Sequence, residues 1–239
     1  MIHLISYGDK KFSNSKKRFC NEANATNWFD SITLYGPEDL DNDFKLKFKN
    51  ILEKPRGAGY WIWKSYIIKK KLDEINDNDI LIYLDVGCSI NPKGKDRFNE
   101  YVEMLNNNDE GIISFQMSHL SEKKWTTKEI FTYFGLEPGG EIANRGQVQA
   151  TTNIMKKNPN SIKCVNLWNE TLYNEPLLFT DHYNKNQEYY FKDNRHDQSI
   201  FSVIRKMHNP ILLEDETWFT PFGNEISLKY PFWATRIRG

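Results

Sequence analysis

The sequence carries no net charge of either sign. Its 32 lysine and arginine residues balance 32 aspartate and glutamate residues, so the formal net charge at pH 7 is zero. Proteins that bind nucleic acids or anionic membranes through phosphate groups usually carry a basic excess. The balance therefore predicts no nucleic-acid partner, although it is compatible with a small basic pocket.

Cysteine and long apolar runs are also scarce. The three cysteines, Cys20, Cys88 and Cys164, fit neither a disulfide framework nor a CxxC metal site, and we expect reduced thiols. No apolar run approaches the length of about 18 residues that a membrane span needs, and the opening run at residues 1–7 is too short for a signal peptide. We expect a cytoplasmic protein without a transmembrane segment.

Several common catalytic signatures are missing. The sequence contains no HExxH zinc motif, no GxSxG nucleophile elbow, no GxGxxG dinucleotide fingerprint and no Walker A loop. Triad hydrolases, zinc enzymes of the HExxH type and dinucleotide-dependent dehydrogenases therefore lose their main support.

Aromatic residues, by contrast, are abundant at 14% of the chain. Disordered chains are poor in aromatics, so this composition indicates a globular protein. The length of 239 residues lies within the reach of one α/β domain, which extends to about 250 residues. No repeat, linker or composition break divides it, and we expect a single domain over residues 1–239.

Hydrophobic periodicity predicts alternating strands and helices in the first half of the chain. The expected strands are residues 2–6, 31–35, 80–84 and 111–116, and the expected helices are residues 15–27, 45–52, 61–75 and 96–105. Strand 80–84 (ILIYL) has the composition of a central strand buried on both faces. Signals weaken later, where residues 129–134, 147–155, 161–172 and 197–207 could be helices or strands. The fold class is α/β, with helices around a central sheet and an irregular C-terminal half.

Asp85 directly follows the predicted central strand. Ligands of open α/β sheets bind beyond the carboxyl ends of the strands. A hard divalent cation bound to a diphosphate takes one or two carboxylates and completes its coordination with phosphate and water oxygens. Asp85 could therefore hold Mg²⁺ or Mn²⁺ under a nucleotide diphosphate, or it could simply begin a turn with Gly87.

The stretch RGAGYWIWK, residues 56–64, combines glycine, aromatic and basic residues. Glycines let a backbone approach a ligand, and the amides at the start of a following helix attract anions. Aromatic rings suit a base or a sugar, and cationic side chains suit phosphate. The alternative is an ordinary loop and helix start whose aromatic side chains fill the core. The residues of interest are Arg56, Gly57, Tyr60, Trp61, Trp63 and Lys64.

A third stretch, NRHDQS at residues 194–199, places Asp197 near the start of a predicted helix. The helix dipole favours an ionised carboxylate there. Such a group could take a proton from a sugar hydroxyl or stabilise a cationic transition state. The alternative is a helix N-cap worth about 1 kcal/mol, with Gln198 on the solvent face.

The order of four stretches resembles small GT-A-fold glycosyltransferases, including polysaccharide and viral glycan enzymes that carry GxGYWxWK and YLDxG blocks. These stretches are ISYG (5–8), RGAGYWIWK (56–64), YLDVGC (83–88) and HDQS (196–199), and the resemblance covers most of the chain. It implies a GT-A-like fold with a mostly parallel central sheet. It also implies a UDP- or GDP-sugar donor at the ends of the first strands, usually with Mn²⁺ or Mg²⁺, and a glycan acceptor.

The same resemblance implies roles for individual residues. On the donor side, Tyr7 would lie near the base and Asp85 at the metal and diphosphate. The other donor-binding residues would be Arg56, Gly57, Tyr60, Trp63 and Lys64. Asp197 would act as the catalytic residue beside the reacting sugar carbon. The acceptor or sugar side would comprise Gln147, Gln149, Asn153, His196 and Gln198, because amides both donate and accept hydrogen bonds. A polar surface helix explains the QVQ sequence equally well.

One departure concerns the metal. The usual D-x-D motif is incomplete, because Gly87 stands at its third position and leaves Asp85 alone. The leading hypothesis is metal-assisted transfer of a hexose from a nucleotide diphosphate sugar to a glycan hydroxyl. The alternatives are a noncatalytic glycan-binding module and a metal-dependent phosphohydrolase, which would normally gather further carboxylates or histidines.

Overall fold

A seven-stranded sheet forms the centre of the computed structural model, which describes residues 1–238. The strand order is β2-β1-β3-β7-β5-β6, with β8 also paired to β5. Strand β7 runs against β3 and β5 runs against β7, so β1, β2, β3, β5 and β8 share one direction and only β6 and β7 oppose it. The predicted mostly parallel sheet is therefore confirmed. The strands are β1 (Ile2–Tyr7), β2 (Ser31–Tyr35), β3 (Ile80–Leu84), β5 (Ile112–Ser121), β6 (Gly146–Val148), β7 (Thr152–Lys156) and β8 (Ile211–Glu214), and a separate pair joins β4 (Ser89–Ile90) to β9 (Phe232–Trp233).

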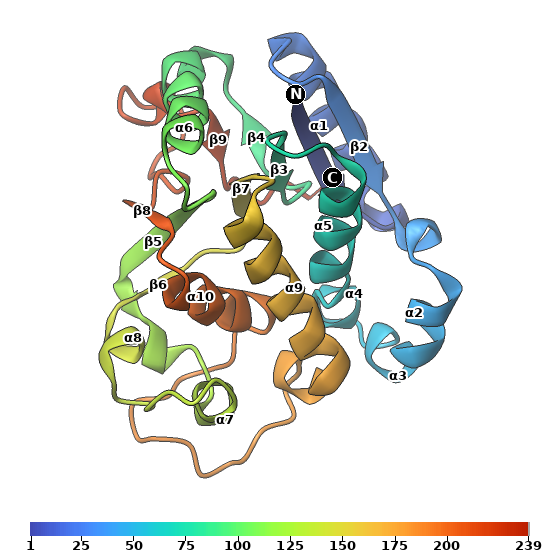
Figure 1. Ribbon diagram of the computed structural model, residues 1–239. Helices are drawn as coiled ribbons and strands as arrows, with labels where there is room; N and C mark the ends of the chain where they lie inside the picture. Colours follow the sequence, from blue (N-terminus) through green and yellow to red (C-terminus); the bar gives the residue numbers. More distant parts are fainter. Residues whose placement is uncertain (239) are drawn as a thin grey trace.

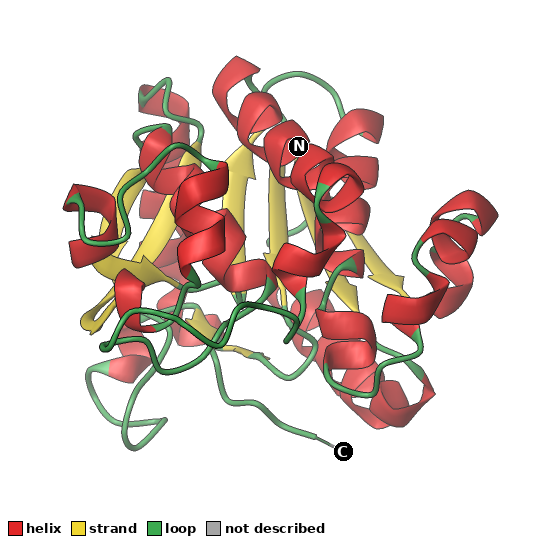
Figure 2. Cartoon of the chain, turned by 90° about the horizontal axis from the view of Figure 1, so that it is seen from below, coloured by secondary structure: helices red, strands yellow, loops and turns green. Residues whose placement is uncertain are grey.

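Helices cover both faces of this sheet (Figure 2). Helices α5, α9 and α10 pack on one face, and α1 and α6 pack on the other (Figure 1). Strand β3 contributes alternate side chains to both layers, Tyr83 to one and Ile82 to the other, as predicted for a strand buried on both faces. The helices are α1 (Ser13–Thr26), α2 (Asn42–Lys47), α3 (Lys49–Leu52), α4 (Gly57–Tyr60), α5 (Trp63–Glu74), α6 (Lys95–Asn107), α7 (Lys128–Tyr133), α8 (Glu141–Asn144), α9 (Pro159–Asn174) and α10 (Asp197–Met207).

Most predicted elements are present, with local differences. The helix expected over residues 45–52 is divided into α2 and α3 at Phe48, and the helix expected from residue 61 begins at Trp63. The open prediction for residues 197–207 is settled as helix α10. The long segments between α9 and α10 and from β8 to residue 238 contain only short 3-10 turns and the two-residue strand β9, in agreement with the irregular C-terminal half. None of the helices in residues 1–238 has the length and apolar character to cross a membrane.

Strands β6 and β7 are two parts of one interrupted strand. Both pair with the same edge of β5, where Gln116 faces Val148 and Ile113 faces Ile154. The residues between them leave the ladder, and the carbonyl of Thr151 accepts a hydrogen bond from the backbone amide of Asp85 at 2.9 Å. The interruption therefore brings backbone carbonyls to the carboxyl end of β3.

Candidate active site

A buried ion-pair centre lies where β3, α5 and α10 meet. The Nζ of Lys64 is 3.2 Å from Oδ1 of Asp85 and 3.0 Å from Oδ2 of Asp197. It also donates a hydrogen bond of 3.2 Å to the carbonyl of Ala150, in the interruption between β6 and β7. Three of the side chains predicted from separate stretches of the sequence are thus in contact.

The centre holds more negative than positive charge. The side chains of Lys64 and Asp197 are 3% and 6% exposed, whereas that of Asp85 is 36% exposed. Burial acts against the charge of Lys64, but Asp197 and Asp85 outweigh burial and raise its pKa. Burial raises the pKa of Asp197, and Asp85 adds to this effect while Lys64 opposes it. Two carboxylates around one ammonium group favour a further cation at the exposed side, next to Asp85.

Asp85 has the exposure that a metal ligand needs. One of its oxygens, Oδ1, accepts a hydrogen bond of 2.6 Å from the Tyr83 hydroxyl. Within residues 1–238, no group of three or more His, Cys, Asp or Glu side chains is arranged to hold a metal ion. A cation that shares its coordination with a diphosphate needs only one or two carboxylates. Asp85 therefore has the properties of the single protein carboxylate that such a cation needs.

Packing around Gly87 leaves little room for a side chain at the third position of the D-x-D motif. A Cβ atom at this position would lie 3.2 Å from the carbonyl oxygen of Ile237 and 3.3 Å from the Cα of Arg236. The backbone amide of Ile237 also donates to the carbonyl of Gly87 at 2.9 Å. The C-terminal segment thus occupies the space beside Gly87, where the backbone of Arg236 passes, while the Arg236 guanidinium group lies over the Trp218 ring at 5.1 Å.

The GAGYW segment forms a left-handed turn. Residues 57–61 all have positive φ, between 49° and 95°, and the amide of Trp61 donates to the carbonyl of Gly57 at 3.2 Å. Non-glycine residues in this conformation cost roughly 1–2 kcal/mol each. A Cβ at Gly59 would lie 2.7 Å from the Cα of Leu52, so this glycine is required by close packing as well as by φ. Strain of this kind collects at binding and switch sites.

Two of the predicted donor-binding rings are buried. Tyr7 and Trp63 stack with ring centroids 3.8 Å apart and planes 15° apart, and each residue is at most 6% exposed. The Nε1 of Trp63 donates to the carbonyl of Gly57 at 3.0 Å. The rings of Tyr7 and Trp63 therefore belong to the core and pack beneath the left-handed turn. The Tyr60 ring, by contrast, is partly exposed.

Asp181 joins the turn to the start of α10, a role that no sequence pattern indicated. Its Oδ1 lies 2.8 Å from Nε2 of His196 and accepts a hydrogen bond of 3.1 Å from Arg56. Arg56 also binds Asp193 at 3.2 Å, and the Tyr60 ring stacks on His196 with centroids 5.0 Å apart. Arg56 is therefore engaged by two carboxylates, and His196, with φ of 55°, is held in a strained conformation next to Asp197.

The predicted acceptor-side amides Gln147, Gln149 and Asn153 are all buried, at most 3% exposed. Gln149 accepts hydrogen bonds from the amides of Thr151 and Thr152, and Asn153 donates to the carbonyl of Ala150. These contacts hold the interruption between β6 and β7 in place. All three amides are therefore buried in this structure, and their place on the acceptor or sugar side stays a prediction.

Gln147 and Glu122 orient the side chain of Gln198. An ionised carboxylate can only accept, so Gln147 donates its Nε2 to Oε1 of Glu122 at 2.8 Å. Its Oε1 then accepts from Nε2 of Gln198 at 2.6 Å, and Oε1 of Gln198 accepts from the amide of Ala150 at 3.2 Å. Glu122 is fully buried and forms an ion pair of 2.6 Å with Lys206. Glu122 was missed because its partners come from distant parts of the chain.

We expect Glu122→Gln to destabilise the protein by about 3–5 kcal/mol, because it leaves the Lys206 ammonium group buried without a counter-charge. Urea unfolding measures the change. The double variant Glu122→Gln/Lys206→Met removes both charges and should recover much of the loss. A cost below about 1 kcal/mol, the range of an exposed salt bridge, would contradict the expectation.

Comparisons with known proteins identify the fold. Neither a protein-family model nor a curated protein matches the chain. The crystal structure of a glycosyltransferase involved in glycosylation of the major capsid of PBCV-1 is similar with a TM-score of 0.55 and 11% identity, over 97% of this chain and 92% of that one. The apo structure of the bifunctional glycosyltransferase WbbM is similar with a TM-score of 0.51 and 8% identity, over 97% of this chain and 45% of that longer chain. The chain has the α/β GT-A fold of these structures, as expected from the resemblance.

Proposed function

We propose that this protein is a glycosyltransferase that moves a hexose from a UDP- or GDP-sugar to a hydroxyl group of a glycan, assisted by Mn²⁺ or Mg²⁺. The observation that carries the proposal is the Lys64–Asp85–Asp197 centre beyond the carboxyl end of β3 in a GT-A fold. Ligands of α/β sheets bind at this end of the strands.

The leaving diphosphate would need positive charge in addition to Lys64. Asp85 would hold the divalent cation, and the cation would neutralise negative charge on the leaving diphosphate. Arg195 stacks on the Trp125 ring at 4.1 Å and forms no ion pair within residues 1–238, and Arg236 lies beside Gly87. Burial and the like charge of Arg236 lower the pKa of Arg195. The Arg236 guanidinium group stacks on the Trp218 ring at 5.1 Å, and guanidinium groups held on aromatic rings in this way would suit a diphosphate.

Asp197 would act at the reacting sugar. Its Oδ2 is buried and is held by the ion pair with Lys64 at 3.0 Å. A carboxylate in this state can accept a proton from an acceptor hydroxyl or stabilise positive charge on the sugar. Gln198, with its amide orientation set through Gln147, would bind a sugar hydroxyl beside Asp197.

The donor would extend from this centre along the left-handed turn. Gly57 and the Tyr60 ring would contact the donor, with Tyr7 and Trp63 supporting the turn from the core. Arg56 and His196 both contact Asp181, and these contacts would fix the position of the left-handed turn relative to the start of α10.

A thermal-shift experiment tests the donor and the metal together. UDP- or GDP-hexose with Mn²⁺ should raise Tm, because a ligand at 100 times its Kd stabilises the native state by about 2.7 kcal/mol. We expect Asp85→Ala to abolish the metal-dependent part of the shift. The control is Asp73→Ala, an exposed aspartate on α5 that pairs with Lys69.

Retention of the full metal-dependent shift in Asp85→Ala would reject Asp85 as the ligand. Release of UDP or GDP in the presence of glycans then tests the reaction itself. A noncatalytic glycan-binding module releases no nucleotide, and a phosphohydrolase attacks simple phosphate esters.

A further inference from the structure

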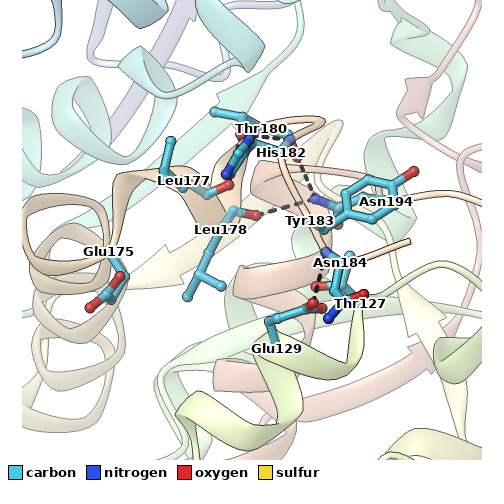
Figure 3. A pocket seen from close by; sticks show the side chains of 10 residues that line it. All are labelled: Thr127, Glu129, Glu175, Leu177, Leu178, Thr180, His182, Tyr183, Asn184 and Asn194. Carbon is cyan, nitrogen blue, oxygen red and sulfur yellow. Dashed lines mark hydrogen bonds between the residues drawn. The ribbon is translucent and has the colours of Figure 1, made fainter. Parts of the chain in front are cut away.

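A cavity of about 320 Å³ lies outside the centre described above, between the end of α9, the start of α7 and the loop that leads to α10 (Figure 3). Its apolar wall comes from Leu177 and Leu178 of η5 (Pro176–Phe179) and from Tyr183. The other lining residues are polar: Thr127, Glu129, Glu175, Thr180, His182, Asn184 and Asn194. An apolar wall with a few convergent polar groups is typical of a site for a small ligand.

The charge of the lining disfavours phosphate groups. It contains two glutamates and neither lysine nor arginine. Glu129 is used to order the loop, since it accepts from the amide of Asn184 at 3.0 Å and from Gln187 at 2.8 Å. Glu175 is exposed to solvent. A nucleotide diphosphate would be repelled here, whereas a neutral molecule that donates hydrogen bonds would not.

Asn194 carries a buried acceptor without a partner. The residue is 1% exposed, and its Nδ2 donates to the carbonyls of Leu178 and Thr180 at 3.2 and 3.1 Å. These two bonds determine which end of the amide is the oxygen. Its Oδ1 has no hydrogen-bond partner in the part of the chain that the structure describes. A buried acceptor is destabilising until a donor reaches it, and a hydroxyl group is a suitable donor.

The cavity shares a wall with the ion-pair centre. Thr180 and His182 line the cavity, while Asp181 between them binds His196 and Arg56 on the side of the centre. Asn194 stands three residues before Asp197, so their Cα atoms are at most about 11 Å apart at 3.6 Å per extended residue. The cavity and Asp197 therefore lie within the length of a short glycan chain of each other.

We propose that this cavity binds an uncharged sugar residue of the acceptor glycan, at a distance from the hydroxyl that receives the hexose. The proposal rests on the proposed transferase function. The sugar's C–H face would pack on Leu177 and Leu178, and its hydroxyl groups would donate to Glu175. A further hydroxyl group would donate to Oδ1 of Asn194 once the side chains that cover this buried atom move aside. The anionic donor would then bind on the side of Arg195 and Arg236. The neutral acceptor would bind on the other side of residues 180–182, next to Glu129 and Glu175.

The first test compares two leucine-to-lysine variants. Leu177 is 49% exposed in the cavity, and Leu46 on α2 is 77% exposed and does not line it. With the best acceptor among neutral glucose, galactose and mannose oligomers, Leu177→Lys should raise the acceptor KM by about tenfold, or 1.4 kcal/mol, without changing the donor KM or Tm. Leu46→Lys should change none of them. An equal acceptor KM in both variants would overturn the proposal.

A second test does not depend on catalysis. Saturation-transfer NMR with the same neutral oligomers, without donor, should show binding to the unaltered protein and to Leu46→Lys, and weakened binding to Leu177→Lys. Absence of binding to the unaltered protein at millimolar oligomer, or tighter binding of glucosamine than of glucose, would overturn the proposal. Binding without any transfer would support the cavity and reject the transferase function, which keeps the two failures distinct.

Discussion

Replacing Asp197 with asparagine is expected to lower sugar transfer by roughly 10²–10⁴-fold, the range for loss of a positioned acid–base group. The substitution keeps the size of the side chain and removes its charge. Lys64 retains Asp85 at 3.2 Å, so donor binding should change little. Steady-state kinetics should therefore show a fall in kcat with a nearly constant donor KM.

The pH profile adds a readout that a purely structural role would not produce. Burial raises the pKa of Asp197, so in the unaltered protein activity should fall with acidification at a pH above the usual range of aspartate. The variant Asp197→Asn should no longer show this acidic fall in its pH–activity profile. The control is Asp77→Asn, an aspartate whose side chain is 84% exposed. A variant Asp197→Asn with near-normal kcat would contradict the catalytic assignment.

Replacing Lys64 with methionine is expected to give the largest loss of stability among single charge removals at the centre, about 3–5 kcal/mol at neutral pH. The substitution leaves Asp197 buried beside Asp85 with no counter-charge. Urea unfolding should measure the loss. Lys69→Met, on the same helix and 33% exposed, removes only a surface pair with Asp73 and should cost at most about 1 kcal/mol.

The loss should depend on pH in a defined direction. Without Lys64, the pKa of Asp197 in the folded protein rises further above its unfolded value. An acid with a raised folded pKa destabilises the native state as pH rises through that pKa, and this effect disappears below the unfolded value. The difference in stability between Lys64→Met and the unaltered protein should therefore narrow on acidification. A difference that stays constant from pH 7 to the acid limit, or a loss equal to that of Lys69→Met, would contradict this account.

The parts of the site that sequence could predict are those defined by short-range patterns. The apolar run ILIYL identified β3, and the position of Asp85 at its end followed from the direction of the strand. The sequence did not decide between helix and strand for residues 197–207, which form α10. Asp197, the first residue of α10, was nevertheless predicted as the catalytic residue. Gly57 and Gly59 were selected for close approach to a ligand, whereas the structure uses them in a left-handed turn.

Other parts depended on contacts between distant residues. Gln149 and Asn153 were predicted on the acceptor or sugar side, and the structure shows in addition that their amides are buried and hold the break between β6 and β7. Glu122 and Asp181 stand in polar segments without any pattern, and their roles come from partners 84 and 15 residues away. Such contacts leave no periodic signal in the sequence.

The sequence by itself determined the α/β class, the central strand and the three stretches that carry Lys64, Asp85 and Asp197. Hydrophobic period and turn chemistry are local, so they can be recognised one segment at a time. Only the tertiary structure decided that these three side chains form one buried centre with an excess of negative charge, and that a separate acidic cavity lies behind it. The pKa of a carboxylate and the partner of a buried amide depend on which segments pack together, and packing joins residues that are far apart in the chain.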